Sequence, residues 1–224
     1  MNKWIVNNYF DYLESNFPAY KQSLTGEYIQ SLEELFFSVN DVFVTCNLFE
    51  KEIFQELNFI NLIREFKTYF SRILLLIPLN DRYILDALFR LLIEKLYRMI
   101  YGLNHIHLNE SSIRKHERWK MGERLEGKLS KKDDLDLLYK EYSNLIHHSS
   151  PTQTDLLNFR QLADYETELL TYANGIVNNL KLIYIIDFLI PLLNEKPLDL
   201  ASRLTLSNEL QQTCKSHLEE VNII

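Results

Sequence analysis

The sequence predicts an all-α fold, a multi-helix bundle of about 7–9 helices. Glycine and proline occur only five times each in 224 residues, so the chain lacks the turn residues that many short strands would need. Apolar residues also recur with a period near 3.6 along most of the chain, which is the pattern of helices that bury one face. The apolar share of 46% and the charged share of 25% are typical of a folded globular protein.

The N-terminal part of the chain predicts two helices. The first covers about Lys3–Phe17 and ends at Pro18, which cannot continue a helix. A second apolar periodicity begins at Gly26. Because the β-branched residues around Val42 weaken this periodicity, we expect a break near Asn40, with a short strand there as the minor alternative.

The middle of the chain predicts longer helical segments. One covers about 50–77 and ends before a proline, and the next covers about 82–101, where Gly102 is placed to cap its C-terminal end. A charged helix is expected over about 113–125, and an amphipathic helix over about 135–148.

The C-terminal part predicts helices over about 154–193 and 198–218. Its most apolar stretch contains Lys181 and Asp187 and is shorter than the roughly 20 residues of a membrane span, so we interpret it as a buried helix and expect no membrane partner. No linker or repeat divides the chain. We therefore expect residues 1–224 to form a single helical unit.

Charge and cysteine content exclude several classes of protein. The net charge of −7 argues against a chain coated in Lys and Arg to hold nucleic acid without specificity. Cys46 and Cys214 lie far apart in the sequence and belong to no C-x-x-C pair, which argues against a disulfide scaffold and a thiolate zinc site. The N-terminus does not resemble a signal peptide, so a cytoplasmic location is expected.

The helix over 82–101 has a second, charged face. Charges of alternating sign recur there every four residues, at Asp86, Arg90, Glu94 and Arg98. One interpretation is a solvated face whose ion pairs contribute about 0.2–0.5 kcal/mol each. The other is that these residues face a groove shared with the helix over 135–148.

That second helix carries Ser143 and His147 four residues apart, so their side chains share one face. A histidine exchanges protons near neutral pH, and an arginine held by a carboxylate stabilises negative charge. A histidine at a helix C-terminus also interacts favourably with the helix dipole, which is the alternative role for His147. The candidate catalytic residues are Arg90, Glu94, Arg98, Ser143 and His147.

The helix over 113–125 carries the densest group of basic residues in the chain. A basic strip with one aromatic surface could hold single-stranded RNA. The alternative is a solvated helix whose positive charges are balanced by neighbouring glutamates. The candidate RNA-binding residues are Arg114, Arg118, Trp119 and Arg124.

Histidines also suggest a metal site, because His105 and His107 form an H-x-H sequence and His147 is followed by a second histidine. Zinc and iron sites on helices normally add carboxylates at a defined spacing, such as Glu-x-x-His, and the sequence contains no such motif. We therefore predict neither a metal nor another cofactor.

At these residues the chain resembles the HEPN superfamily of helical domains, which occur in toxin–antitoxin, abortive-infection and CRISPR-associated systems. The resemblance covers about residues 81–151. It is carried by Arg90-Leu-Leu-Ile-Glu94, by the arginine-rich helix, and by Leu138-Tyr-Lys-Glu-Tyr-Ser-Asn-Leu-Ile-His147. It implies a protein of a stress or antiviral (phage) defence system that binds RNA, or acts as a ribonuclease without metal, usually as a dimer.

Active members of that superfamily carry an arginine followed four to six residues later by a histidine, usually with a polar residue directly after the arginine. Arg98 and His105 have six residues between them, but Met99 follows the arginine. His147 is preceded at the same spacing by Lys140, which lacks the planar fork of arginine. Cleavage would proceed by attack of a ribose 2′-hydroxyl, with His147 or His105 moving protons, and a relative that only binds RNA remains an alternative.

A second hypothesis belongs to a different class of protein. The chain would then be a non-enzymatic helical module, or a subunit of a larger complex, that binds a partner protein or a second copy of itself. In that case the charged row and the Ser/His pair would be structural, and the aromatic-rich helices would form the interface.

Overall fold

The computed structural model describes residues 3–50, 54, 56–148 and 167–224, with the side chains of 3, 146–148 and 167 left out. Within these ranges the chain is 82% helical and has no strands, which confirms the all-α prediction. Nine of the helices in this part of the chain contain seven residues or more.

The described residues form helices along most of their length. In chain order they are α1 (Lys3–Asn16), α2 (Pro18–Ser23), α3 (Gly26–Leu48), α4 (Ile60–Ser71), α5 (Ile73–Leu76), the 3-10 turn η2 (Ile77–Leu79), α6 (Arg82–Asn104), α7 (Glu110–Lys115), α8 (Arg118–Arg124), α9 (Lys132–His148), α11 (Thr167–Tyr184), the π-helical turn η4 (Ile185–Leu189), α12 (Ile190–Glu195), α13 (Leu200–Glu209) and α14 (Gln212–Glu220).

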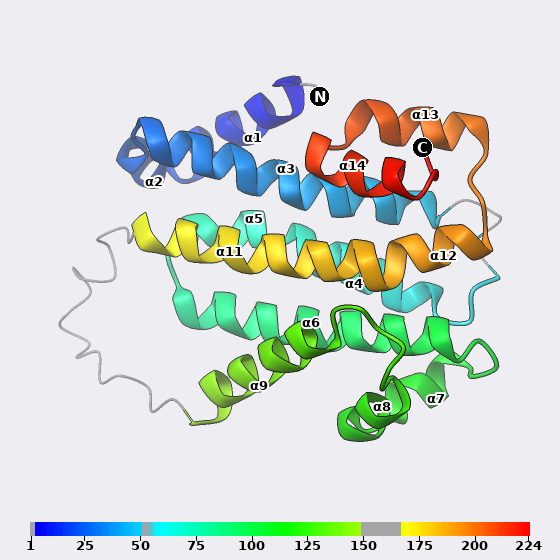
Figure 1. The fold of residues 1–224 in the computed structure, drawn as a ribbon. Coiled ribbons are helices and arrows are strands. Elements are labelled where there is room, and N and C mark those ends of the chain that lie inside the picture. The colour runs from blue at the N-terminus through cyan, green and yellow to red at the C-terminus, as the bar shows by residue number, and fades with distance from the viewer. Residues whose placement is uncertain (1–2, 51–53, 55, 149–166) are drawn as a thin grey trace.

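Figure 1 shows α11 in the middle of the molecule, with α3 on one side and α6 on the other. Helix α4 contacts both α3 and α6, and α9 packs on α6. Helices α13 and α14 lie over α3 and η4, at the opposite side of the molecule from α7 and α8. The two ends of the fold therefore present separate surfaces.

The buried apolar side chains of the described residues join into one cluster that runs from α1 to α14. Aromatic rings fill its centre, where Tyr184 lies 5.6 Å from Phe66 and 5.6 Å from Phe188 between ring centroids. Full burial of such a side chain contributes about 1.5–3 kcal/mol. Packing, more than helix propensity, therefore fixes where the helices lie.

Helix α3 is continuous, so the expected break near Asn40 and the alternative strand are both wrong. The β-branched Val42 is only 1% exposed, and the hydroxyl of Thr45 donates to the carbonyl of Asp41 at 2.9 Å. Burial against α11 and α4 outweighs the lower helix propensity of these residues.

Helix α6 extends beyond its expected end. Asp81 caps its start by accepting a hydrogen bond from the Ile84 N–H at 3.0 Å. Gly102 lies inside the helix and does not cap it. A Cβ at this position would lie 2.9 Å from the Phe59 ring and 3.0 Å from Ile113, so the glycine permits close packing of the helix.

The expected helix over 113–125 is two short helices. His116 and Glu117 are extended, with ψ angles of 132° and 138°, and separate α7 from α8. The expected helix over 198–218 is likewise divided, because Leu210 and Gln211 are extended between α13 and α14. Leu210 is 1% exposed, so its burial fixes the second corner.

The predicted helix over about 154–193 corresponds to α11, η4 and α12, which end at Glu195. In the described residues it runs over Glu168–Glu195 with a mean hydropathy of 1.7 in its most apolar window, and 61% of that window is buried inside the molecule. A buried core helix and a membrane helix both pass such a test. The expected start near residue 154 lies outside the described residues.

Candidate functional site

The charged row of α6 is partly buried. Glu94 accepts hydrogen bonds from Arg90 Nη1 at 3.3 Å and from Arg98 Nη2 at 2.9 Å. Both arginine side chains are only 15% exposed, so the row is not a freely solvated face. Asp86 stands apart, because it accepts a hydrogen bond from the Tyr172 hydroxyl at 2.7 Å on α11.

Arg90 faces α9, as the groove hypothesis expects. Its guanidinium lies 3.9 Å from the centroid of the Tyr139 ring, and Arg118 lies 4.4 Å from the same centroid. Arg90 also donates to the Tyr139 hydroxyl. Contacts of this kind contribute about 0.5–2 kcal/mol each. Tyr139 thus joins α6, α8 and α9 through two cations.

Arg98 points away from α9. Its Nη1 donates to the carbonyls of Ile113 at 2.9 Å and Arg114 at 2.6 Å, and His116 O lies 3.5 Å away. These carbonyls lie at the end of α7, where a helix leaves its last carbonyls without a partner one turn on; the Ile113 carbonyl also accepts from the His116 N–H at 3.3 Å. Arg98 therefore holds the α7–α8 corner in place.

Ser143 and His147 lie toward the start of α6. Helix α9 runs antiparallel to α6, because Tyr97 hydrogen-bonds Asp136 at 3.2 Å while Phe89 contacts the Tyr142 ring at 5.8 Å between centroids. The half-buried Ser143 is thus one turn beyond Tyr139 and on the Arg90 side of the row. The backbone of His147 belongs to α9, but its side chain lies outside the described residues.

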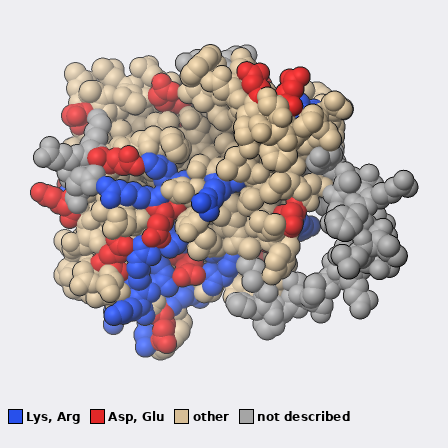
Figure 2. All heavy atoms as spheres, turned by 180° about the vertical axis from the view of Figure 1, so that it is seen from behind, with Lys and Arg blue, Asp and Glu red and all other residues tan. Residues whose placement is uncertain are grey.

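Two of the predicted RNA-binding cations are held by carboxylates. Arg114 contacts both Glu65 and Glu110 at 2.6 Å, and Arg118 pairs with Asp136. Trp119 is 55% exposed. Figure 2 shows Lys and Arg side chains gathered with Asp and Glu among them near the end that carries α7 and α8. The surface is mixed in charge, with one exposed indole.

Arg124 belongs to a cluster that the sequence did not predict. Its Nη1 donates to the Tyr101 hydroxyl at 2.7 Å and lies 2.9 Å from His116 Nε2. His105 stacks on the same tyrosine with ring centroids 4.2 Å apart, and the His116 centroid lies 5.3 Å from it. We call His105, Tyr101, His116 and Arg124 the histidine cluster.

The hydrogen bonds fix the tautomers of both imidazoles. His105 Nδ1 lies 3.0 Å from the Tyr101 carbonyl, and His116 Nδ1 lies 2.7 Å from the Ser112 carbonyl. A carbonyl only accepts, so each Nδ1 carries the proton. An arginine only donates, so His116 Nε2 accepts from Arg124. Burial lowers the pKa of His105, which favours its neutral form and an unprotonated Nε2 that can take a proton.

His116 escaped prediction because a continuous helix over 113–125 was expected. In a continuous helix, the eight-residue separation of His116 and Arg124 would place them about 12 Å apart along the axis. The extended corner instead folds α8 back and brings their side-chain nitrogens to 2.9 Å. His105 was found through its spacing from Arg98. The structure places these two residues at the same end of α6 but gives Arg98 a different partner, the carbonyls of α7.

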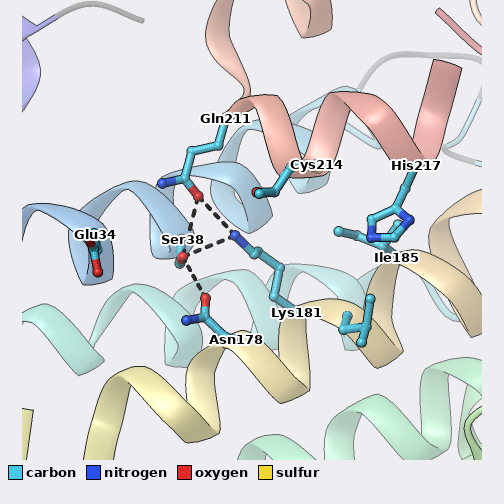
Figure 3. Close-up of a pocket in the computed structure, with 10 residues that line it drawn as sticks. Glu34, Ser38, Asn178, Lys181, Ile185, Gln211, Cys214 and His217 are labelled. Carbon is cyan, nitrogen blue, oxygen red and sulfur yellow. Dashed lines mark hydrogen bonds between the residues drawn. The ribbon is translucent and has the colours of Figure 1, made fainter. Parts of the chain in front are cut away.

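A second polar cluster lies between α3, α11 and α14 and was also missed (Figure 3). Lys181 donates to Ser38 Oγ at 3.0 Å, Asp41 Oδ2 at 3.2 Å and Gln211 Oε1 at 2.9 Å. Burial raises the pKa of Asp41, while the Lys181 charge opposes that rise. The sequence did contain one indication of this cluster: Lys181 interrupts an apolar helix, and a lysine buried in such a helix needs a polar or charged partner.

No metal site stands out among the described residues, in which no three His, Cys, Asp or Glu side chains gather as a metal ion would require. Comparison with known proteins found no matching family model, no matching curated protein and no matching solved structure. The functional argument therefore rests on the geometry of these clusters.

Proposed function

We propose that the chain is a HEPN-like, cytoplasmic protein of a stress or phage-defence system that binds single-stranded RNA and cleaves it without metal. The observation that carries the proposal is the histidine cluster, in which His105, His116 and Arg124 surround one tyrosine. This combination supplies a base, an acid and a fixed positive charge within one site.

Three members of the cluster have a part in the reaction, and Tyr101 is the ring around which they gather. His105 Nε2 accepts the proton of a ribose 2′-hydroxyl, whose oxygen attacks the adjacent phosphorus. Arg124 gives up its hydrogen bond to His116 and binds the phosphate, where its charge stabilises the negative charge that the phosphate gains. His116 takes up a proton from water at Nε2 once Arg124 has moved to the phosphate, and gives that proton to the departing 5′ oxygen. The products are a 2′,3′-cyclic phosphate and a 5′-hydroxyl.

Residues near the cluster support binding and positioning. The exposed Trp119 on α8 offers a surface on which a base can stack, and such stacking contributes about 1–3 kcal/mol per base. Arg98 keeps the α7–α8 corner, and with it His116, against α6. Arg98 is thus a positioning residue in this proposal.

The test uses single-stranded RNA incubated with the purified chain in EDTA, with the all-deoxy strand of the same sequence as control. We expect cleavage of RNA alone, and a loss of about 10²–10⁴-fold in His105→Gln and in His116→Gln. The matched control is His107→Gln, a histidine two positions from His105 that is absent from the proposed chemistry. Equal cleavage by all three variants would refute the assignment.

The same assay separates the histidine cluster from the Ser143 and His147 pair predicted from sequence. If Ser143→Ala and His147→Gln lose cleavage while His105→Gln keeps it, the site lies on α9 instead. The rate should follow a bell-shaped pH profile. Because burial lowers the pKa of His105, its acid limb should lie below the ordinary histidine value of about 6.5.

One observation favours the second candidate function, a helical module that binds a partner protein or a second copy. Exposed apolar side chains gather around the start of α6, where Leu79 is 48%, Tyr83 64% and Ile84 43% exposed. Two results together would support this candidate over the nuclease. RNA would stay intact at a high excess of protein, and light scattering would show a dimer that Tyr83→Glu disrupts.

A further inference from the structure

A cavity on other helices carries an inference that is independent of RNA. It lies between α3, α11 and α14 and has a volume of about 350 Å³, within the range of roughly 300–1,000 Å³ that small-molecule pockets occupy. The buried Ser38 and Lys181 form its polar floor. The exposed Asn178 stands at its rim (Figure 3).

The charges at the floor of the cavity are already balanced. Lys181 Nζ lies 3.2 Å from the carboxylate of Asp41, and the two side chains are 9% and 1% exposed. A charged group of a ligand placed at the floor would bring a further, uncompensated charge next to this buried pair, at a desolvation cost. Glu34 and His217 also line the cavity, but Glu34 is exposed and His217 is half-buried, so water reaches both. The cavity therefore suits an uncharged molecule.

Gln211 occupies the position that a ligand carbonyl would take. Its Oε1 accepts one proton of Lys181 at 2.9 Å, while its backbone N–H donates to Asp41 at 2.8 Å. The backbone bond fixes the start of α14 independently of the side chain, which makes no capping hydrogen bond there. The side chain can thus swing out and leave a lysine proton for another acceptor.

Asn178 provides the complementary half of the recognition. Its Oδ1 accepts from Ser38 Oγ at 2.9 Å, and a second donor can share this oxygen because it has two lone pairs. Beside it, Leu182, Ile185 and Cys214 give the cavity an apolar wall. A ligand edge with adjacent carbonyl and N–H groups fits Lys181 and Asn178, and a flat apolar body fits the wall.

We propose that this cavity binds a small, uncharged cyclic amide or ureide, the chemical class that includes the nucleobases. The ligand carbonyl accepts from Lys181 in place of Gln211, and the ligand N–H donates to Asn178.

Three small probes test the class by calorimetric titration of the whole chain. Uracil carries the full edge, 1,3-dimethyluracil lacks the N–H groups, and benzoate has a ring of similar size with a negative charge. We expect uracil to bind at least about tenfold more tightly than the other two. No binding of uracil at millimolar concentration, or tighter binding of benzoate, overturns the proposal.

Two adjacent glutamines supply a matched pair of variants. Gln211→Ala should tighten uracil binding by about tenfold, because the side chain that competes for Lys181 is gone. Gln212→Ala, on the exposed start of α14, should leave it unchanged, and Asn178→Leu should weaken it about tenfold. Weaker binding in Gln211→Ala would contradict the displacement. None of these residues belongs to the histidine cluster, so RNA cleavage should persist whichever result is found.

Discussion

The arginine row of α6 and the lysine of α11 use the same chemistry in opposite surroundings. Arg90 and Arg98 share Glu94, whose side chain is 35% exposed, so water reaches the pair. Lys181 and Asp41 are 9% and 1% exposed and satisfy one another inside the fold. An arginine that loses its partner can be rehydrated, whereas the buried lysine cannot. Removal of the cationic side chain should therefore lower the free energy of unfolding much more at Lys181 than at the arginines of α6.

The largest effect should follow from breaking the buried pair. Lys181→Met leaves the Asp41 carboxylate without its cation and should lower the free energy of unfolding by about 3–5 kcal/mol. The double variant Lys181→Met/Asp41→Asn removes both charges and keeps an oxygen for the Gln211 N–H, so it should regain most of that loss. Urea denaturation measures both. A single variant within about 1 kcal/mol of the parent would mean that the pair is hydrated.

An intermediate effect is expected at Arg98, whose guanidinium holds the carbonyls of α7. Arg98→Ala should cost about 2–3 kcal/mol, because hydrogen bonds from a charged donor to partly buried carbonyls are lost. Hydrogen exchange should become faster in α7 and α8 before other helices respond. Arg64→Ala is the control, since the Arg64 side chain is exposed and donates to the exposed Asn61 at 3.1 Å, and it should stay within about 0.5 kcal/mol.

The smallest effect concerns pH, and its sign differs between the half-buried Glu65 of α4 and the buried Asp41. Burial alone would raise the pKa of Glu65, but hydrogen bonds from Arg114 and Lys95 outweigh it and lower that pKa. Its stabilising contribution is then present above the ordinary glutamate value of about 4.3 and is lost as pH falls through the folded pKa. Burial raises the pKa of Asp41 instead, so its contribution is lost as pH rises.

Glu65→Gln tests that sign. Because the side chain is 34% exposed, water screens the pair, and the variant should lose at most about 1 kcal/mol at pH 7. Between pH 5 and pH 3 its unfolding free energy should fall less steeply than that of the parent. A steeper fall in the variant would show that Glu65 does not retain its charge in the folded state.

The sequence predicted the helices that have a clear apolar periodicity of their own. Helix α6 was found because Leu92, Leu96 and Ile100 form a continuous buried arc, and its charged face followed from the same spacing. The contact of Arg90 with α9 was also expected. Local periodicity was sufficient for these features because every residue involved lies within one or two neighbouring helices.

The contacts that the sequence did not predict join residues that are far apart in the chain, or depend on extended residues between two helices. Lys181 and Asp41 are 140 positions apart, so no local pattern pairs them. His116 meets Arg124 only because the chain is extended between α7 and α8, and the propensities of a charged stretch do not reveal such a corner. Gly102 appeared to be a cap because its close contact is with Phe59, a residue distant in the sequence that lies just before α4.

The π-helical turn η4 has a consequence for how this chain can change in length. A π turn holds one residue more than an α turn, so it offsets the two flanking segments by about 100°. Before it, Lys181 points to α3; within it, Asp187 accepts the N–H groups of Ser130 and Lys131, both at 2.9 Å, just ahead of α9. Deleting a single residue here would rotate one of these anchors out of reach, so insertions and deletions should be far less tolerated in this helix than substitutions.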